Sequence, residues 1–288
     1  MEIISFVILH YGDSEITDRC VQSICSMEGQ EAVQLVIVDN DIGKKDALRF
    51  ERKKKYEQQA PNITVLINRG NGGFSEANNL GYQYARDRLK ASFILVLNND
   101  IEFIQKDFPT HLYQAYQECK CHVLGPDIIR SGTGEHQNPL DERLRTKEEA
   151  EATIRKNRMA LKLYPLLYWN NRWMERAQTQ ERKKSKDYYK SKKEKIVPFG
   201  ACLIFTPLFV KAEEKAFDPE TQFYYEEYIL ACRCQKKGYR IVYDPSLKMH
   251  HESGKATSRR FRGEYGRLKF MMERIIQACT IYCTMLKK

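Results

Sequence analysis

The sequence predicts an α/β fold in which a mostly parallel sheet is flanked by helices. Three observations lead to this prediction. The first hundred residues contain four short apolar runs, each run is nearly uniformly apolar, and segments able to form helices separate the runs. Strands covered on both faces have this composition, and strands that alternate with helices pair in parallel through right-handed crossovers.

The predicted strands and helices follow one another along these hundred residues. The strands are expected at residues 3–9, 33–38, 63–67 and 92–98. Helices are expected over residues 18–28, where Thr17 and Asp18 are candidate caps, and over residues 75–89 after Gly73. In such a sheet, ligands bind beyond the carboxyl ends of the strands.

The chain beyond residue 130 predicts further elements. Residues 141–195 are charged and helical in pattern, which indicates an inserted helical segment, and an apolar core pattern returns at residues 196–206. A helix stopped by Gly238, a strand and a loop with two histidines follow. The tail from residue 263 to residue 288 predicts an amphipathic helix, because apolar residues recur at three- and four-residue steps: Leu268, Met272, Ile275, Cys279, Tyr282 and Leu286.

Length and composition are those of a globular protein. The chain has 288 residues, of which 42% are hydrophobic, enough for a sizeable core. No apolar run approaches the roughly 20 residues of a membrane-spanning helix, and the N-terminus lacks the features of a signal peptide. The nine cysteines contain no C-x-x-C pair, so we expect reduced thiols packed in the core of a cytoplasmic protein.

The net charge of +10 is concentrated in two segments. Residues 181–195 carry eight basic and three acidic groups, and residues 255–288 carry nine basic and two acidic groups. Together they hold +12, so the rest of the chain sums to −2. Basic groups on an amphipathic tail helix favour peripheral binding to an anionic membrane surface, and simple packing of that helix on the body is the equal alternative.

Polar residues follow each of the four predicted strands. The four ends are His10-Tyr11-Gly12-Asp13, Asp39-Asn40-Asp41, the glycine- and asparagine-rich stretch at residues 67–85, and Asn98-Asn99-Asp100. Any one of these ends is explained by the preference of Asp and Asn for turns. Four polar ends on one edge of a sheet indicate a binding site.

Several common sites are excluded by their motifs. Gly70 and Gly72 begin a G-x-G-x-x-G pattern, but Ser75 stands at the place of the third glycine. The sequence also lacks a P-loop and a G-x-S-x-G elbow, so dinucleotide-binding, P-loop and serine-hydrolase functions are not predicted.

The remaining polar residues have the chemistry of group transfer from an activated nucleotide. Asp100 follows a buried strand, where one carboxylate can hold a hard cation while phosphates complete its shell. The glycine-rich turn offers backbone N–H groups to anionic oxygens, and Asp39 can accept hydrogen bonds from a base or ribose. The Glu226-Glu227 pair can supply a general base.

Six segments resemble the family 2 glycosyltransferases, especially their rhamnosyltransferase-like branch. In order they are FVILHYGD, LVIVDN, NRGNGGFSEANNLG, LVLNND, FGACLIF and YYEEYILACRCQKKGYRIVYDPSLKMHH. The resemblance runs from about residue 3 to residue 253, and residues 131–195 fall outside it. It implies a GT-A (Rossmann-like) fold and an inverting transfer of a sugar from a nucleoside diphosphate to an acceptor hydroxyl. A Mg²⁺ or Mn²⁺ cofactor is implied as well.

The resemblance also implies roles for individual residues. Asp100 and His251 would bind the metal, with His250 as the neighbouring alternative. Glu227 would be the base by position and Glu226 its alternative, although Ile229 stands where the family often has a second Asp. The residues expected to bind the donor are His10, Tyr11, Asp39, Asn68, Gly72, Gly73, Asn78, Asn98 and Asn99.

These expectations divide the chain into four segments. Residues 1–130 would be the nucleotide-sugar-binding half, residues 131–195 a basic helical insertion, residues 196–258 the acceptor and catalytic half, and residues 259–288 an amphipathic helix. The expected donor is dTDP-rhamnose or a UDP-hexose. The expected acceptor is a glycan or lipid-linked glycan of surface polysaccharide synthesis, such as capsule or cell envelope, made at the inner face of a membrane.

Three other functions are weighed against this one. A sugar nucleotidyltransferase shares the nucleotide and metal requirements, but residues 9–20 lack its glycine-rich basic signature. Nucleic-acid binding is suggested by basic segments with interleaved aromatic residues, but no recognised module accompanies them. An inactive relative that serves as a scaffold is disfavoured because the acidic and histidine residues are all present.

Overall fold

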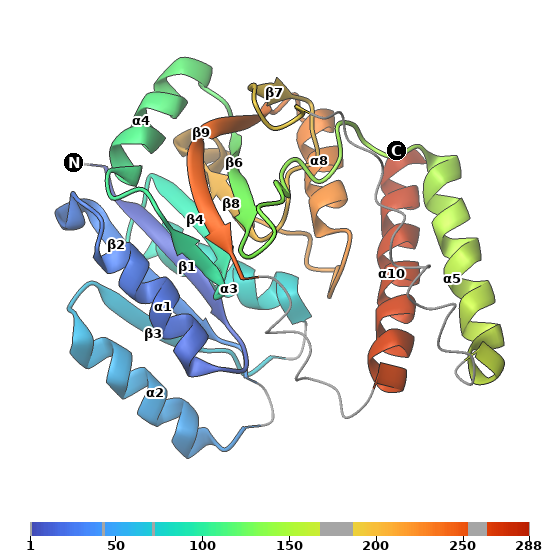
Figure 1. Cartoon of the computed structure of the whole chain (residues 1–288), viewed down its shortest axis with the longest axis horizontal. Helices are drawn as coiled ribbons and strands as arrows, with labels where there is room; N and C mark the ends of the chain where they lie inside the picture. Colours follow the sequence, from blue (N-terminus) through green and yellow to red (C-terminus); the bar gives the residue numbers. More distant parts are fainter. Residues whose placement is uncertain (1, 42–43, 71–72, 168–186, 253–263, 288) are drawn as a thin grey trace.

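The computed structural model describes residues 2–41, 44–70, 73–167, 187–252 and 264–287 (Figure 1). The predicted donor-binding residue Gly72 lies outside these residues. So do residues 181–186 and 255–263 of the two basic segments.

The N-terminal half forms the predicted parallel sheet. Its strands pair in the order β3-β2-β1-β4, all in parallel. The strands are β1 (Ile4–His10), β2 (Val33–Asp39), β3 (Ile63–Ile67) and β4 (Phe93–Asn98). The helices between them are α1 (Ser14–Cys25), α2 (Asp46–Gln59) and α3 (Gly73–Asp87), with a short turn η1 (Gln30–Ala32) before β2.

Helix α1 begins four residues before the predicted start. The side chain of Asp13 accepts a hydrogen bond from the backbone N–H of Glu15 at 3.0 Å, so Asp13 is the cap instead of Thr17 or Asp18. The earlier start leaves Thr17 fully buried inside the helix, where its hydroxyl contacts His10. A capping side chain near the start of a helical pattern is therefore an uncertain marker of the boundary when several candidates are adjacent.

The sheet continues into the C-terminal half with mixed strand directions. Strand β8 (Cys202–Phe205) pairs antiparallel with β4 and β6 (Val123–Arg130), and β9 (Ile241–His251) pairs in parallel with β6. The short strands β5 (Ile101–Phe103) and β7 (Lys193–Glu194) pair antiparallel with β9. Only two residues separate β4 from β5, which is too short a link for the helical crossover that a parallel neighbour needs.

Helices cover both faces of this single sheet. The remaining helices are α4 (Phe108–Cys119), α5 (Lys147–Leu167), α7 (Pro207–Ala212), α8 (Glu226–Lys236) and α10 (Glu264–Lys287). Adjacent strand residues such as Phe6 and Val7 pack into two separate apolar clusters, one on each face. Eight of the nine cysteines are buried and Cys25 is partly buried, as expected for core residues.

Helices α5 and α10 lie side by side at one end of the molecule (Figure 1). Met272, Cys279 and Tyr282, from the predicted apolar stripe of the tail, are buried there, so the packing alternative describes this face of α10. The stripe is therefore not free to insert into a membrane. No helix among the described residues combines the length and the apolar character needed to cross a bilayer.

Candidate active site

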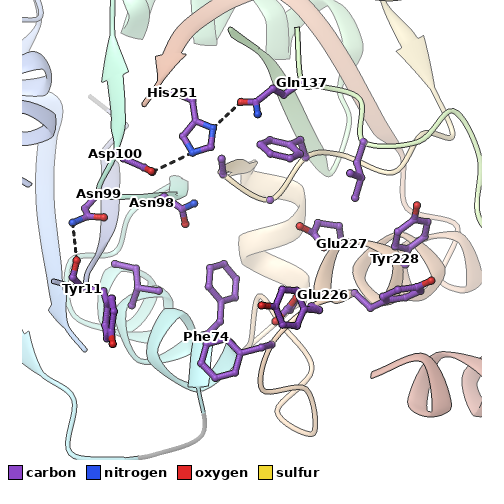
Figure 2. A pocket seen from close by; sticks show the side chains of 18 of the residues that line it. Tyr11, Phe74, Asn98, Asn99, Asp100, Gln137, Glu226, Glu227, Tyr228 and His251 are labelled. Carbon is purple, nitrogen blue, oxygen red and sulfur yellow. Dashed lines mark hydrogen bonds and ion pairs between the residues drawn. The ribbon is translucent and has the colours of Figure 1, made fainter. Parts of the chain in front are cut away.

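A cleft of about 610 Å³ opens at the carboxyl edge of the sheet (Figure 2). One side carries the polar ends of β1, β4 and β9, and the other carries the start of α8 with the aromatic turn before it. The predicted site residues that line the cleft are Tyr11, Asn98, Asn99, Asp100, Glu226, Glu227 and His251. Residues separated by up to 240 positions are thus brought together.

Asp100 and His251 form a buried pair on the sheet side of the cleft. His251 Nε2 lies 3.2 Å from Asp100 Oδ1, and their side chains are 7% and 5% exposed. The two atoms are close enough for an ion pair but are not aligned as a hydrogen bond, and Asp100 Oδ1 has no hydrogen-bond partner. Adjacent ligands of an octahedral cation, each about 2.1 Å from it, are about 3 Å apart, so the pair fits a divalent cation.

The cation would need ligands beyond these two side chains. Within the described parts of the chain, no group of three or more His, Cys, Asp or Glu side chains converges on one point. Mg²⁺ and Mn²⁺ sites that serve nucleotides commonly use one or two protein ligands and complete the shell with phosphate oxygens and water. The donor set of Asp100 and His251 is of that kind.

The two adjacent histidines of β9 have different surroundings. His251 lines the cleft and pairs in register with Ile101, while His250 pairs with Glu102 and does not line the cleft. Successive strand residues point to opposite faces, so only one of the two histidines can face Asp100. The geometry favours His251 over His250.

Glu226 and Glu227 begin helix α8 on the opposite side of the cleft from Asn98 and Asp100 (Figure 2). The two residues before them, Tyr224 and Tyr225, have φ angles of 68° and 64°, in the left-handed region that non-glycine residues rarely occupy. Arg145 donates a hydrogen bond to the Tyr225 hydroxyl at 2.6 Å. This contact helps to hold a strained turn that aims both glutamates at the cleft.

The environment of both glutamates favours the protonated form. Burial, together with the negative charge of Glu227, raises the pKa of Glu226 to about 8, and Glu226 Oε1 has no hydrogen-bond partner. Burial also raises the pKa of Glu227, while hydrogen bonds from its own backbone and from Gly200 act in the opposite direction. A carboxyl group with a raised pKa is a stronger base when ionised.

Gly200 allows the close approach of Glu227. A Cβ atom at residue 200 would lie 2.3 Å from Glu227 Oε1, so any side chain there would displace the carboxylate. Gly200 lies next to Phe199 at the base of β8, and both line the cleft. The sequence contained a signal for this position, a glycine between an aromatic residue and a buried strand, but its spacing to the glutamates could not be read from it.

The glycine- and asparagine-rich stretch holds the loop that leads to the glutamates. A Cβ atom at Gly73 would lie 2.3 Å from the Gln222 carbonyl oxygen, and Ser75 hydrogen-bonds Thr221 at 2.8 Å. Asn79 exchanges two 2.9 Å hydrogen bonds with the backbone of Phe217. These contacts use the stretch to position the loop at residues 217–222.

Gly73 and Asn78, two predicted donor-binding residues of this stretch, do not line the cleft. Asn78 is fully buried, and neither polar atom of its side chain has a hydrogen-bond partner. The donor-binding roles of both residues stay predictions.

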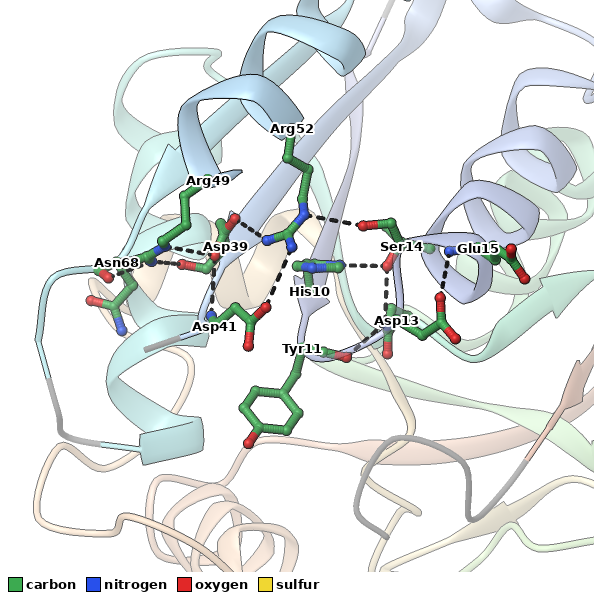
Figure 3. Close-up of polar contacts among 12 residues, drawn as sticks. His10, Tyr11, Asp13, Ser14, Glu15, Asp39, Asp41, Arg49, Arg52 and Asn68 are labelled. Carbon is green, nitrogen blue, oxygen red and sulfur yellow. Dashed lines mark hydrogen bonds and ion pairs between the residues drawn. The ribbon is translucent and has the colours of Figure 1, made fainter. Parts of the chain in front are cut away.

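Asp39 is enclosed by arginines (Figure 3). Its side chain is 0% exposed, and its two oxygens accept hydrogen bonds from Arg49 Nε at 3.0 Å and from an Arg52 nitrogen at 2.5 Å. The predicted contact between Asp39 and the nucleotide stays a prediction, and it requires an arginine to move. The neighbouring Asn40, which lines the cleft, is hydrogen-bonded to the predicted donor-binding residue Asn68 at 2.8 Å.

His10 and Asn99 position the ends of β1 and β4. His10 is 0% exposed and shares a 2.6 Å hydrogen bond with Thr17, and burial, followed by the charge of Arg52, lowers the pKa of His10 to about 4. Asn99 donates to the Thr17 hydroxyl at 2.9 Å and to the Tyr11 carbonyl at 3.3 Å. His10 does not line the cleft, so its expected contact with the donor is not seen in this arrangement.

Part of the cleft comes from segments that sequence reasoning placed elsewhere. Gln137 and Leu140 belong to residues 131–195, which fell outside the family resemblance, and Ile275 belongs to the tail helix. Phe74, Phe223 and Tyr224 add an aromatic wall. No motif marked these residues, because their place depends on how the insertion and the tail pack beside α8.

A family comparison and a curated relative both identify glycosyltransferases. The family described as "Glycosyl transferase family 2" matches residues 5–193. The low-salt glycan biosynthesis hexosyltransferase Agl10 of Haloferax volcanii is 25% identical over 143 residues, which are 49% of this chain and 42% of that protein. The chain therefore spans about two fifths of the length of this relative.

Solved glycosyltransferase structures share the fold. GalNAc-T7, crystallised with UDP, GalNAc and Mn²⁺, matches 87% of this chain and 44% of its own with a TM-score of 0.58 and 13% identity. The mannosyltransferase PcManGT of Pyrobaculum calidifontis, in complex with GDP-Man and Mn²⁺, matches 99% of this chain and 72% of its own with a TM-score of 0.53 and 10% identity. At these identities the likeness concerns the fold, and it confirms the predicted GT-A architecture.

Proposed function

The chain belongs to glycosyl transferase family 2 and is a glycosyltransferase, and from this premise we propose that it transfers a sugar with inversion in a metal-dependent reaction. The donor would be a nucleoside-diphosphate sugar and the acceptor a hydroxyl group of a glycan or lipid-linked glycan. The observation that carries the proposal is the cleft in which the Asp100–His251 pair faces the two buried glutamates.

The proposed reaction moves one proton and one glycosidic bond. Glu227 accepts the proton of the acceptor hydroxyl as its oxygen forms a bond to the anomeric carbon, on the face opposite the nucleoside diphosphate. The bond between the anomeric carbon and the diphosphate oxygen breaks, and the bonding pair leaves with the diphosphate. Asp100 and His251 would hold Mg²⁺ or Mn²⁺, which when bound neutralises the charge on that leaving group.

The comparisons support a nucleotide-sugar donor without selecting one. The solved neighbours bind UDP with GalNAc in one case and GDP-Man in the other, both with Mn²⁺, and the curated relative is a hexosyltransferase of glycan biosynthesis. We therefore keep dTDP-rhamnose and UDP-hexoses as the proposed donors, with surface polysaccharide as the proposed product. Any binding to an anionic membrane surface would depend on the basic groups of the tail, and co-sedimentation with anionic vesicles that weakens with salt would support it.

A ligand screen followed by a transfer assay tests the proposal. Thermal unfolding would be measured with UDP-, dTDP- and GDP-sugars, each with and without Mn²⁺, because a ligand that binds the folded state raises Tm. The best donor would then be incubated with glycan acceptors, and the anomeric configuration of the product determined. Stabilisation that needs Mn²⁺, and a product of inverted configuration, are expected. No stabilisation by any donor, or release of pyrophosphate from a nucleoside triphosphate and a sugar phosphate, would contradict the proposal.

A further inference from the structure

We propose that Gln137 is a positioning residue that controls cation binding through His251. Its side-chain amide selects which ring nitrogen of His251 carries the proton, and so opens or closes the Asp100–His251 pair. The inference rests on the proposed function, because it concerns the site assigned there to the cation. Nothing in the sequence pattern marks Gln137.

The backbone fixes Gln137 beside His251. After β6 the chain reverses, and the Gln137 N–H donates to the Ile128 carbonyl at 2.8 Å. In the neighbouring strand, β9, His251 is in register with Arg130. The Gln137 side chain is buried, with its amide 2.7 Å from His251 Nδ1. Figure 2 shows the chain of contacts from Gln137 through His251 to Asp100.

One orientation of the amide opens the pair. When Gln137 Oε1 faces His251, the oxygen can only accept, so Nδ1 must carry the proton and donate it across the 2.7 Å contact. The other ring nitrogen, Nε2, then has a lone pair directed toward Asp100 Oδ1. A neutral histidine that binds a metal through one nitrogen needs this tautomer, with the second nitrogen donating to an acceptor.

The opposite orientation closes the pair. With the amide turned over, its nitrogen donates to His251 Nδ1 at 2.7 Å, and its oxygen accepts from Arg130 Nη2 at 3.1 Å and Nε at 3.3 Å. The proton of His251 is then on Nε2, 3.2 Å from Asp100 Oδ1. Both polar atoms of the amide have good partners in this state, so it is the favoured one when no cation is bound.

The two orientations make Gln137 a two-state element that both a cation and Arg130 influence. Binding of the cation requires the open state, while Arg130, itself ion-paired with Glu135 at 2.9 Å, stabilises the closed state. Removing the accepting oxygen should therefore weaken cation binding, and a side chain that can only accept should strengthen it. Changes to such outer partners commonly alter metal affinity about 10–100-fold.

Direct titration of Mn²⁺ tests this inference without an activity assay. The six-line electron paramagnetic resonance signal of free Mn²⁺ would be followed during titration of the full chain, with and without UDP. Gln137→Met should bind Mn²⁺ at least tenfold more weakly than the wild type, and Gln137→Glu at least as tightly. Gln114→Glu on the exposed face of α4 is the control for added charge. Thermal unfolding would confirm that each variant folds.

Nitrogen NMR of the histidine ring separates the tautomer from the added charge. Without Mn²⁺, His251 in the wild type should carry its proton on Nε2, and in Gln137→Glu on Nδ1. Wild-type Mn²⁺ affinity in Gln137→Met, or an Nδ1 proton in the cation-free wild type, would overturn the inference alone. Unchanged Mn²⁺ binding in both Asp100→Asn and His251→Ala would instead overturn the cation site of the proposed function, and the inference with it.

Discussion

Two buried aspartates at the ends of strands in the same parallel sheet have opposite surroundings. Asp39 ends β2 and is 0% exposed, and its oxygens accept from Arg49 and Arg52. Asp100 follows β4 and is 7% exposed, yet its Oδ1 has no hydrogen-bond partner and lies 3.2 Å from a histidine nitrogen. One carboxylate is fully compensated by the fold, and the other is held in an arrangement that a ligand would complete.

The difference teaches how to separate structural from functional carboxylates. Buried charges and polar atoms are normally paired, because an unpaired one costs free energy. An unpaired group is retained where function requires it, at the expense of stability. Glu226, buried with Oε1 unpartnered, belongs with Asp100 in this respect. Each prediction below tests whether this division is real.

The largest expected effect is that of Asp100→Asn on sugar transfer. The amide keeps the shape of the side chain but removes the charge that would hold the cation, so kcat/KM should fall at least about a thousandfold. The free energy of unfolding should change by less than about 1 kcal/mol, because no compensated ion pair is broken. Steady-state kinetics and urea unfolding measure the two quantities. An equally active variant would remove the distinction between Asp100 and Asp39.

The next effect is that of Glu227→Gln on turnover. A glutamine cannot take the acceptor proton, so kcat should fall about a hundred- to a thousandfold, while the dissociation constant of the donor stays within about threefold. Single-turnover kinetics and donor titration measure them. Glu226→Gln is the matched variant one residue away. If it abolishes turnover while Glu227→Gln remains active, the base is Glu226.

Local patterns were enough to predict the parallel half of the fold. The four apolar runs at residues 3–9, 33–38, 63–67 and 92–98 became β1, β2, β3 and β4, because their burial on both faces is written in their composition. The mixed directions of β8 and β9 were not predicted, since strand direction depends on the length and path of each connection.

The residues of the site divide in the same way. Asp100, His251 and the two glutamates were singled out before the fold was known, and the structure brings them to one cleft. Asp39 carried the same local signal as Asp100, but Arg49 and Arg52 reach it from one helix turn of α2, and no pattern announces that contact. Partners that arrive through tertiary packing are what sequence reasoning misses.

The opposite half of the comparison is tested by Asp39→Asn. The substitution leaves Arg49, whose side chain is 6% exposed, buried without its counter-charge, so the free energy of unfolding should fall by about 3 kcal/mol. Asp87→Asn, which breaks the exposed pair with Arg86, is the control and should cost less than about 1 kcal/mol. Urea unfolding measures both. A loss at Asp39 no larger than at Asp87 would show that the enclosed pair contributes nothing special.

The smallest effect is the pH dependence of stability that Glu226 confers. Its pKa is raised to about 8 in the folded protein by burial and by Glu227, so the folded state holds the proton more tightly than the unfolded chain does. Stability should therefore fall as pH rises from the pKa of the unfolded chain, about 4.5, toward 8, by up to about 1.4 kcal/mol per pH unit. Glu226→Gln lacks this titration, so its stability relative to the wild type should increase from pH 5 to pH 8 in urea unfolding. Glu214→Gln, at an exposed position, should show no such trend. Parallel curves for the wild type and Glu226→Gln would mean that Glu226 is compensated in the folded state, as Asp39 is, and that it does not belong with Asp100.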